Sequence, residues 1–219
     1  KKHYNNNSNS NNNNCNDIPI CIEKIINQIL FKSHKKADEE FLQLANRQRW
    51  KDGSTSVSCI ILNINKFIKI LINDKKYNTF IDRIAKPNDT CIFVANTGDS
   101  RCILVKNNGE IKEMSYDHKP NSESERHRIT QNGGRVVFFG TWRVEGILAV
   151  SRSFGDRLLK RWIIPDCDII KHKININKDL FLILATDGVW DTVSNMDAAK
   201  ISINEWNNNN NNLNNNNIN

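Results

Sequence analysis

The amino-acid sequence predicts an α+β domain in which helices cover packed β-sheets. Runs rich in β-branched residues recur along the chain between turn residues, which is the pattern of short antiparallel strands. Apolar residues at helical spacing near the start, and two later capping signals, predict the helices. A chain of 219 residues, 38% of them hydrophobic, is long enough to bury one core of this kind.

Three helical regions are predicted. Between residues 22 and 45, apolar residues recur three or four positions apart, which indicates one long helix or two. Ser122 and Glu125 have the spacing of a capping box, in which each side chain bonds the backbone N–H of the other residue. Ser194 with Asp197 gives a similar helix start. The predicted helices therefore cover residues 22–45, 122–131 and 194–206.

Eight strands are predicted from clusters of β-branched and aromatic residues. They cover residues 54–62, 90–95, 102–106, 110–114, 134–138, 146–150, 168–171 and 180–185. Asn108 and Gly109 favour a tight hairpin between the third strand and the fourth. Antiparallel strands interrupted by a few helices favour sheets that pack against each other and carry helices on their outer faces.

Segments of low complexity divide the chain. Residues 1–16 and 207–219 are rich in asparagine, and such polar sequence buries too little apolar surface to offset the entropy of ordering. The segment 63–89, rich in Lys, Asn and Ile, is predicted to be an insertion between paired strands. One domain is therefore expected over residues 17–206.

Composition argues against several classes of protein. The net charge is +7, but the lysines and arginines are scattered and are not interleaved with aromatic residues, so a nucleic-acid partner is not expected. The longest apolar stretch, residues 59–72, is broken by Asn and Lys, so no membrane span is expected. The six cysteines include no Cys-x-x-Cys pair, which favours reduced thiols and an intracellular location, in cytoplasm or nucleus.

Three aspartates are candidate metal ligands. Asp99 lies in a turn directly after a predicted strand, and Asp187 and Asp191 follow another. Carboxylates delivered at strand ends suit Mg²⁺ or Mn²⁺, and a four-residue spacing lets Asp187 and Asp191 share a side if the segment turns helically. Each aspartate alone is equally compatible with an ordinary turn or surface acid, and a lone histidine such as His118 is more often structural than catalytic.

The order of the motifs is far more specific than any single one. Together they resemble the type 2C (PPM) family of metal-dependent serine/threonine protein phosphatases. The motifs are Asp-Gly-Ser-Thr at 52–55, Val-Ala-Asn-Thr-Gly-Asp-Ser-Arg at 94–101, Asp-His-Lys-Pro at 117–120, Glu-Arg at 125–126 with Gly-Gly-Arg-Val at 133–136, Leu-Ala-Val-Ser-Arg-Ser-Phe-Gly-Asp at 148–156, and Leu-Ile-Leu-Ala-Thr-Asp-Gly-Val-Trp-Asp at 182–191.

The resemblance implies a four-layer αββα sandwich that hydrolyses phosphoserine and phosphothreonine on proteins. It implies two or three Mg²⁺ or Mn²⁺ ions in a complete domain, which activate the attacking water. By motif, Asp187 matches a ligand of the main metal pair, and Asp99 and Asp191 match ligands of a further ion. Arg143, Ser151 and Asp156 match family motifs without an assigned role. A monomer that acts on phosphorylated proteins is expected.

Departures from the family pattern lead to further expectations. The family's early Glu-Asp pair, its Asp-Gly-His-Gly-Gly segment, an early phosphate-binding Arg and a closing Asp-Asn segment do not occur in this sequence. The chain is therefore interpreted as a domain truncated at both ends and inactive by itself. A catalytically inactive pseudophosphatase, acting as a binding or regulatory module, is the alternative, and a basic nucleic-acid-binding protein is a remote third.

Overall fold

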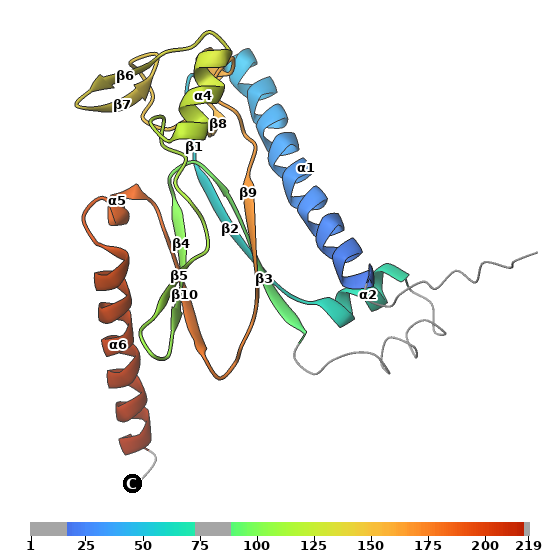
Figure 1. Ribbon diagram of the computed structural model, residues 1–219, viewed down its shortest axis with the longest axis vertical. Helices are drawn as coiled ribbons and strands as arrows, with labels where there is room; N and C mark the ends of the chain where they lie inside the picture. Colours follow the sequence, from blue (N-terminus) through green and yellow to red (C-terminus); the bar gives the residue numbers. More distant parts are fainter. Residues whose placement is uncertain (1–16, 73–88, 217–219) are drawn as a thin grey trace, which may run out of the picture.

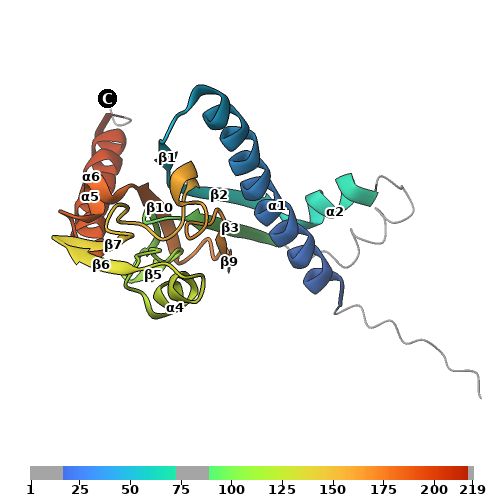
Figure 2. The ribbon, with the colours of Figure 1, turned by 90° about the horizontal axis from the view of Figure 1, so that it is seen from above.

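The computed structural model describes residues 17–72 and 89–216, which form four layers in the order helix, sheet, sheet, helix. Figures 1 and 2 show the layers from two directions. Helix α1 covers the outer face of one three-stranded sheet, and α6 covers the outer face of the other. The predicted α+β sandwich flanked by helices is confirmed.

Both sheets are antiparallel. The first has the order β2-β3-β9, with β2 at Ser56–Asn63, β3 at Thr90–Thr97 and β9 at Asp168–Lys173. The second has the order β10-β4-β5, with β10 at Asp179–Ala185, β4 at Arg101–Lys106 and β5 at Ile111–Glu113. Strands β3 and β4 lie at the centres of the two sheets and follow each other in the chain, so the turn between them bridges the sandwich.

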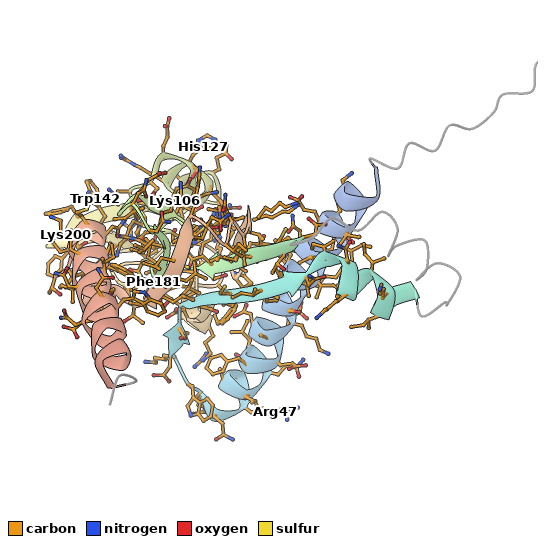
Figure 3. All side chains as sticks on the ribbon, turned by 90° about the horizontal axis from the view of Figure 1, so that it is seen from below. Arg47, Lys106, His127, Trp142, Phe181 and Lys200 are labelled. Carbon is orange, nitrogen blue, oxygen red and sulfur yellow. The ribbon has the colours of Figure 1, made fainter. Side chains whose placement is uncertain are left out.

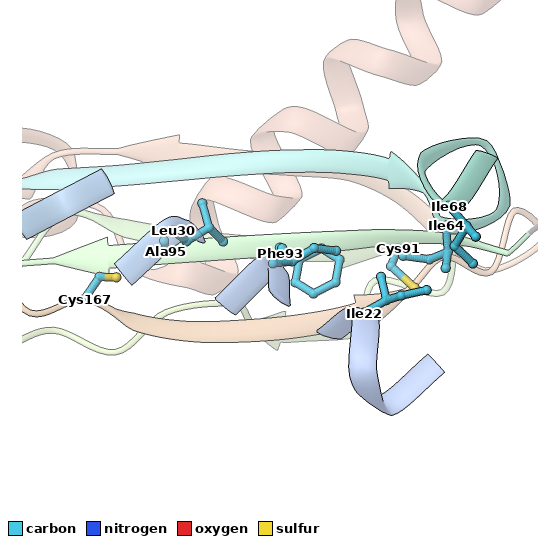
Figure 4. Close-up of a cluster of buried hydrophobic side chains, with 9 residues drawn as sticks. Ile22, Leu30, Ile64, Ile68, Cys91, Phe93, Ala95 and Cys167 are labelled. Carbon is cyan, nitrogen blue, oxygen red and sulfur yellow. The ribbon is translucent and has the colours of Figure 1, made fainter. Parts of the chain in front are cut away.

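Side chains of the central strands alternate between two cores. Phe93 and its neighbours two residues away face α1 (Asp17–Gln48) and α2 (Ile64–Ile72), as Figure 4 shows. The intervening residues face the second sheet and pack against alternate residues of β4. The other β4 residues pack under α5 (Asp187–Trp190) and α6 (Asn195–Asn216), where Phe181 of β10 also lies (Figure 3). This period of two residues is what allows one strand to serve two layers.

A smaller unit sits at one end of the sandwich (Figure 1). It contains α4 (Glu123–Gln131), β6 (Val136–Phe139), β7 (Thr141–Val144), β8 (Phe154–Gly155) and the short 3₁₀ turn η1 (Arg157–Leu159). Its core is formed by Ile129, Val144, Leu159 and Ile163. Strand β8 pairs with β1 (Gly53–Ser54), which ties the unit to the sandwich.

Several local predictions are confirmed. The first apolar region is one helix, α1. The segment around Asn108 and Gly109 closes a hairpin between β4 and β5, with Gly109 at a positive φ of 81°. The hydroxyl of Ser194 accepts a hydrogen bond from the backbone N–H of Asp197 at 3.1 Å, so it caps α6 as expected. Strands β2 and β3, on either side of the predicted insertion, are paired.

Other local predictions are wrong or incomplete. Within the described structure, the expected strand at 146–150 is replaced by a turn through Glu145 and Gly146, both at positive φ, and Leu148 makes an isolated bridge to Val144. The strand in this region is β7, paired with β6 through a turn at Gly140. Helix α6 extends beyond Trp206 to Asn216, because lengthening an anchored helix avoids the cost of nucleation.

The insertion and the cysteines are described in part. Residues 64–72 of the insertion form α2, whereas 73–88 and the N-terminal asparagine tract lie outside the described residues. Cys59, Cys91, Cys102 and Cys167 are free thiols, and burial raises the pKa of Cys102 to about 12. Among residues 17–72 and 89–216, no helix is both long enough and apolar enough to cross a membrane.

Truncating the aromatic ring at the centre of the first sheet should destabilise the protein strongly. Phe93 is fully buried between α1 and its sheet, so Phe93→Ala should lower the free energy of unfolding of the full-length protein by about 3–5 kcal/mol in urea denaturation. Phe139→Ala is the matched control, because this ring is exposed on β6 and its loss should cost about 0.5 kcal/mol or less. Equal losses for the two variants would contradict the described core.

Candidate active site

The turn between β3 and β4 presents a buried carboxylate. Asp99 is only 4% exposed, and it follows Gly98, whose φ of +106° favours glycine. A Cβ atom at Gly98 would lie 2.3 Å from the Cγ2 atom of Thr55, so the turn also needs glycine for space. Thr55 shares a hydrogen bond of 2.8 Å with Ser100 on the other side of Asp99. The motifs at 52–55 and 94–101 therefore meet at this turn.

Lys119, from the Asp-His-Lys-Pro motif, neutralises Asp99. Its Nζ donates a hydrogen bond of 2.5 Å to Oδ2 of Asp99. Burial lowers the pKa of Lys119, but the hydrogen bond to Asp99 and the negative charges of Asp99, Asp117 and Asp191 outweigh burial and raise it. Three carboxylates thus act on one ammonium group, so negative charge exceeds positive charge around Lys119.

Asp187 is the first residue of the short helix α5, and Asp191 directly follows its last residue. The segment turns helically as expected, since the N–H of Asp191 donates to the carbonyl of Asp187 at 2.8 Å. Both aspartates are exposed, which keeps water available to their charges. Trp190, between them in sequence, is buried, and its indole N–H donates to the carbonyl of Ala185 at 2.9 Å and to that of Arg101 at 3.2 Å. Trp190 therefore ties α5 to the ends of β10 and β4.

Arg101 joins this corner to the Asp-His-Lys-Pro segment. Its guanidinium makes two hydrogen bonds to Asp117, of 2.9 and 2.7 Å, and a third to Asn195 at the start of α6. The Asp117 hydrogen bonds raise the pKa of Arg101, and the group lies 5.4 Å from the centre of the Trp190 ring. Bidentate pairing of this kind fixes orientation as well as charge.

The structure brings two of the predicted ligands into one electrostatic environment. Asp99 and Asp191 both act on Lys119, whereas Asp187 lies at the other end of α5. In the part of the chain that the structure describes, no three His, Cys, Asp or Glu side chains lie close enough to hold one metal ion. The oxygen-rich donors suit Mg²⁺ or Mn²⁺, so these residues fit part of a hard-cation site and do not complete one. The ligand assignments stay predictions.

A buried ionic network lies beside the turn, and sequence reasoning missed it. Glu125 is only 3% exposed and accepts hydrogen bonds from Arg128 at 2.8 Å and from Arg152 at 2.7 and 3.1 Å. Arg152 also donates to Asp168 at 2.9 Å, and Asp168 contacts Nε2 of His118 at 3.2 Å. Burial raises the pKa of Glu125, but hydrogen bonds from Arg152 and Arg128 outweigh burial and lower it to about 2.

The capping-box interpretation of Glu125 is therefore wrong. Ser122 occupies the N-cap position, but no side-chain capping bond forms at this helix end in the described structure. Two arginines take the carboxylate instead, because a buried charge needs full compensation and a single backbone N–H cannot supply it. A clue was present in the sequence: Arg152 interrupts a run of small and apolar residues, where an unpaired arginine would be costly.

The three unassigned motif residues have structural partners. Ser151 is fully buried, and its N–H and hydroxyl both donate to the carbonyl of His118 at 2.9 Å. Asp156 accepts from Ser153, and its own N–H donates to the carbonyl of Asp52 at 2.9 Å, so it holds β8 against β1. Arg143 donates to the carbonyl of Ile147 across the turn that follows β7. His118 is buried and fully bonded, as the structural interpretation expects.

Glu125 should make stability depend on pH in the acid range. Its folded pKa lies below its ordinary value, so its stabilisation is present above about pH 5 and is lost as the pH falls toward 2. Glu125→Gln should therefore cost roughly 3 kcal/mol at pH 7 in urea denaturation of the full-length protein, with the gap to wild type narrowing below pH 5. Glu123→Gln, which removes an exposed acid of the same helix, should leave the free energy of unfolding and its pH dependence as they are in wild type. A difference in unfolding free energy between Glu125→Gln and wild type that does not change with pH would refute the network.

Known proteins are similar to this chain over most of its length. The family model described as Protein phosphatase 2C matches residues 5–218. Two curated relatives are "Probable protein phosphatase 2C 59" of Arabidopsis thaliana, 40% identical over 166 residues, and "Probable protein phosphatase 2C 55" of Oryza sativa subsp. japonica, 36% identical over 202 residues. The alignments cover 76% and 92% of this chain and 44% of each relative, so the chain spans less than half the length of these relatives.

Solved structures share the fold. A serine-threonine phosphatase 2C from Toxoplasma gondii superposes with a TM-score of 0.67 at 21% identity, covering 88% of this chain and 60% of that one. A C. elegans sex determining protein superposes with a TM-score of 0.62 at 26% identity, covering 78% of this chain and 36% of that one. Since the family model matches nearly all of the sequence and the fold agrees, the chain belongs to the protein phosphatase 2C family.

Proposed function

We propose that the full-length protein hydrolyses phosphoserine and phosphothreonine on proteins, and that this chain supplies part of its metal site. The observation that carries the proposal is the Gly98–Asp99 turn. It presents a buried carboxylate, and side chains from the motifs at 52–55, 94–101 and 117–120 surround it. Convergence of family motifs on one carboxylate, in a chain that belongs to the family, supports a shared chemistry.

We assign Asp187 to the main metal pair and Asp99 and Asp191 to a further ion. Mg²⁺ or Mn²⁺, two or three ions in a complete domain, would supply a water of lowered pKa and positive charge for the phosphoryl oxygens. The residues of this chain hold and orient these carboxylates. Trp190 anchors α5 against β4 and β10, and Lys119 compensates the charge of Asp99. The described residues gather fewer than three such ligands at one point, and we propose that residues outside the described part of the chain complete the site.

Exposed residues on the inner faces of two edge strands support the need for further chain. Ile61 of β2 and Leu184 of β10 share the side of their strands that packs between the sheets, yet they are 61% and 41% exposed. Apolar side chains at that depth are normally covered, and unpaired strand edges are a hazard for a folded protein. Additional strands from the full-length protein would cover both residues.

A pseudophosphatase is the second candidate, and the Lys119–Asp99 ion pair favours it. The ammonium already compensates the carboxylate that the assignment gives to a metal ion. In that case the sandwich would bind a partner without catalysis.

We propose phosphorylated proteins as substrates, no nucleic-acid partner, a monomeric state, and an intracellular location in cytoplasm or nucleus. The four free cysteines support the intracellular location.

Manganese-dependent hydrolysis of a phosphothreonine peptide tests the proposal. The full-length protein should be active, and Asp187→Asn should reduce activity at least about 100-fold, because the loss of a metal ligand removes charge stabilisation. Asp99→Asn should raise the Mn²⁺ concentration needed for half-maximal activity. The 219-residue chain alone should show no activity above background.

The matched control is Glu205→Gln, which removes an exposed acid of α6. It should leave activity and metal requirement unchanged. A folded wild-type protein that stays inactive at millimolar Mn²⁺ would overturn the phosphatase proposal and favour the pseudophosphatase.

A further inference from the structure

We propose that His118 is a positioning residue, which holds the Gly98–Asp99 turn in place through the backbone of Gly98. The inference rests on the proposed function, because it gives His118 a role in presenting Asp99 to metal. His118 is only 4% exposed, and it approaches the turn from the segment between β5 and α4. We assign His118 no contact with the reacting atoms.

Two hydrogen bonds join His118 to the same glycine. The N–H of Gly98 donates to Nδ1 of His118 at 3.0 Å, and the N–H of His118 donates to the carbonyl of Gly98 at 2.9 Å. The side-chain amide of Asn96 donates to that carbonyl as well, at 3.0 Å. Both polar groups of the Gly98 backbone are therefore occupied inside the protein. The two peptide units that flank the Cα atom of Gly98 are each held by a hydrogen bond, so neither can rotate without breaking a buried hydrogen bond.

The bond from Gly98 fixes the donor and acceptor roles of the two nitrogens of the histidine ring. Because Nδ1 accepts this hydrogen bond, Nε2 is the ring nitrogen that donates. Nε2 then donates to Oδ2 of Asp168 at 3.2 Å. The hydrogen bond from His118 lowers the pKa of Asp168, with help from the charge of Arg152, to about 2, so this acceptor is ionised at neutral pH.

The ring is held from the far side as well. Arg152 donates to Oδ1 of Asp168 at 2.9 Å and is itself held by Glu125 of α4. Ser151 donates twice to the backbone carbonyl of His118. A continuous set of contacts therefore runs from α4 through Asp168 and His118 to the residue next to Asp99. Ligands supported in this way keep their geometry, and loose support is costly to metal binding.

Two substitutions separate the two hydrogen bonds of the histidine ring, one to Gly98 and one to Asp168. His118→Asn places an amide oxygen near the position of Nδ1, so it can still accept from Gly98 but does not reach Asp168. His118→Gln places an amide nitrogen near Nε2, so it can still donate to Asp168 but does not serve Gly98. If His118 acts through Gly98, the Asn variant rescues function and the Gln variant does not. If the histidine were merely structural, the two variants should lose function to a similar extent.

The experiment uses the full-length protein with Mn²⁺ and a phosphothreonine peptide. We expect His118→Ala and His118→Gln to raise the Mn²⁺ concentration for half-maximal activity about tenfold, as for the loss of one buried hydrogen bond, and His118→Asn to stay within about threefold of wild type. Hydrogen exchange at the Gly98 amide, resolved by fragmentation mass spectrometry, should accelerate about tenfold in Ala and Gln and stay slow in Asn. His127→Asn and His127→Gln, at an exposed histidine of α4, are the controls and should match wild type (Figure 3).

Two results would overturn the inference. One is a Gly98 amide that exchanges equally fast in the Asn and Gln variants. The other is a half-maximal Mn²⁺ concentration that, across the three His118 variants, changes only in step with their loss of thermal stability. An inactive wild-type protein would refute the proposed phosphatase function instead, and the exchange rates of Gly98 would then decide whether His118 holds the turn.

Discussion

Burial of the Asp99 carboxylate is the constraint on which the surrounding structure depends. A carboxylate that is almost entirely out of water needs a positive partner and hydrogen-bond donors at fixed positions. Lys119 supplies the charge, which brings the segment after β5 against the turn between β3 and β4. Because β3 and β4 are the central strands of different sheets, the same turn also connects the two sheets at this end of the sandwich.

A second buried acid connects the smaller unit to the sandwich. Glu125 belongs to α4, and Arg152, which it binds, belongs to the segment before β8 and also contacts Asp168 at the start of β9. Breaking one partner of such a network would leave another charge buried without compensation. Because moving α4 away from the first sheet would break this network, the network couples the two, although α4 has its own small hydrophobic core. Through Asp168 and His118 the coupling extends to the Gly98–Asp99 turn.

Local patterns predicted most of the elements, because the forces behind them act over a few residues. Clusters of β-branched and other apolar residues marked β3 and β4, Asn108 and Gly109 marked the hairpin between β4 and β5, and Ser194 marked the start of α6. The wrong predictions occurred where one sequence pattern is compatible with two different local structures. The segment after Gly140 has strand-like composition throughout, and only pairing with β6 selects residues 141–144 over 146–150. The capping spacing of Glu125 likewise gave no sign of its arginine partners.

By itself the sequence identified the family and the candidate aspartates, since motif order is a property of the linear chain, and the resemblance to that family implied the αββα layers. Only the tertiary structure decided which charges share an environment. Asp99 meets Lys119, twenty residues later in the chain, and the charge of Asp191 also acts on Lys119, whereas Asp187 lies at the other end of α5. The roles of Ser151 and His118 likewise depend on contacts between distant segments. Such contacts follow from how the sheets pack and from the need to compensate buried charge, and no local spacing encodes either.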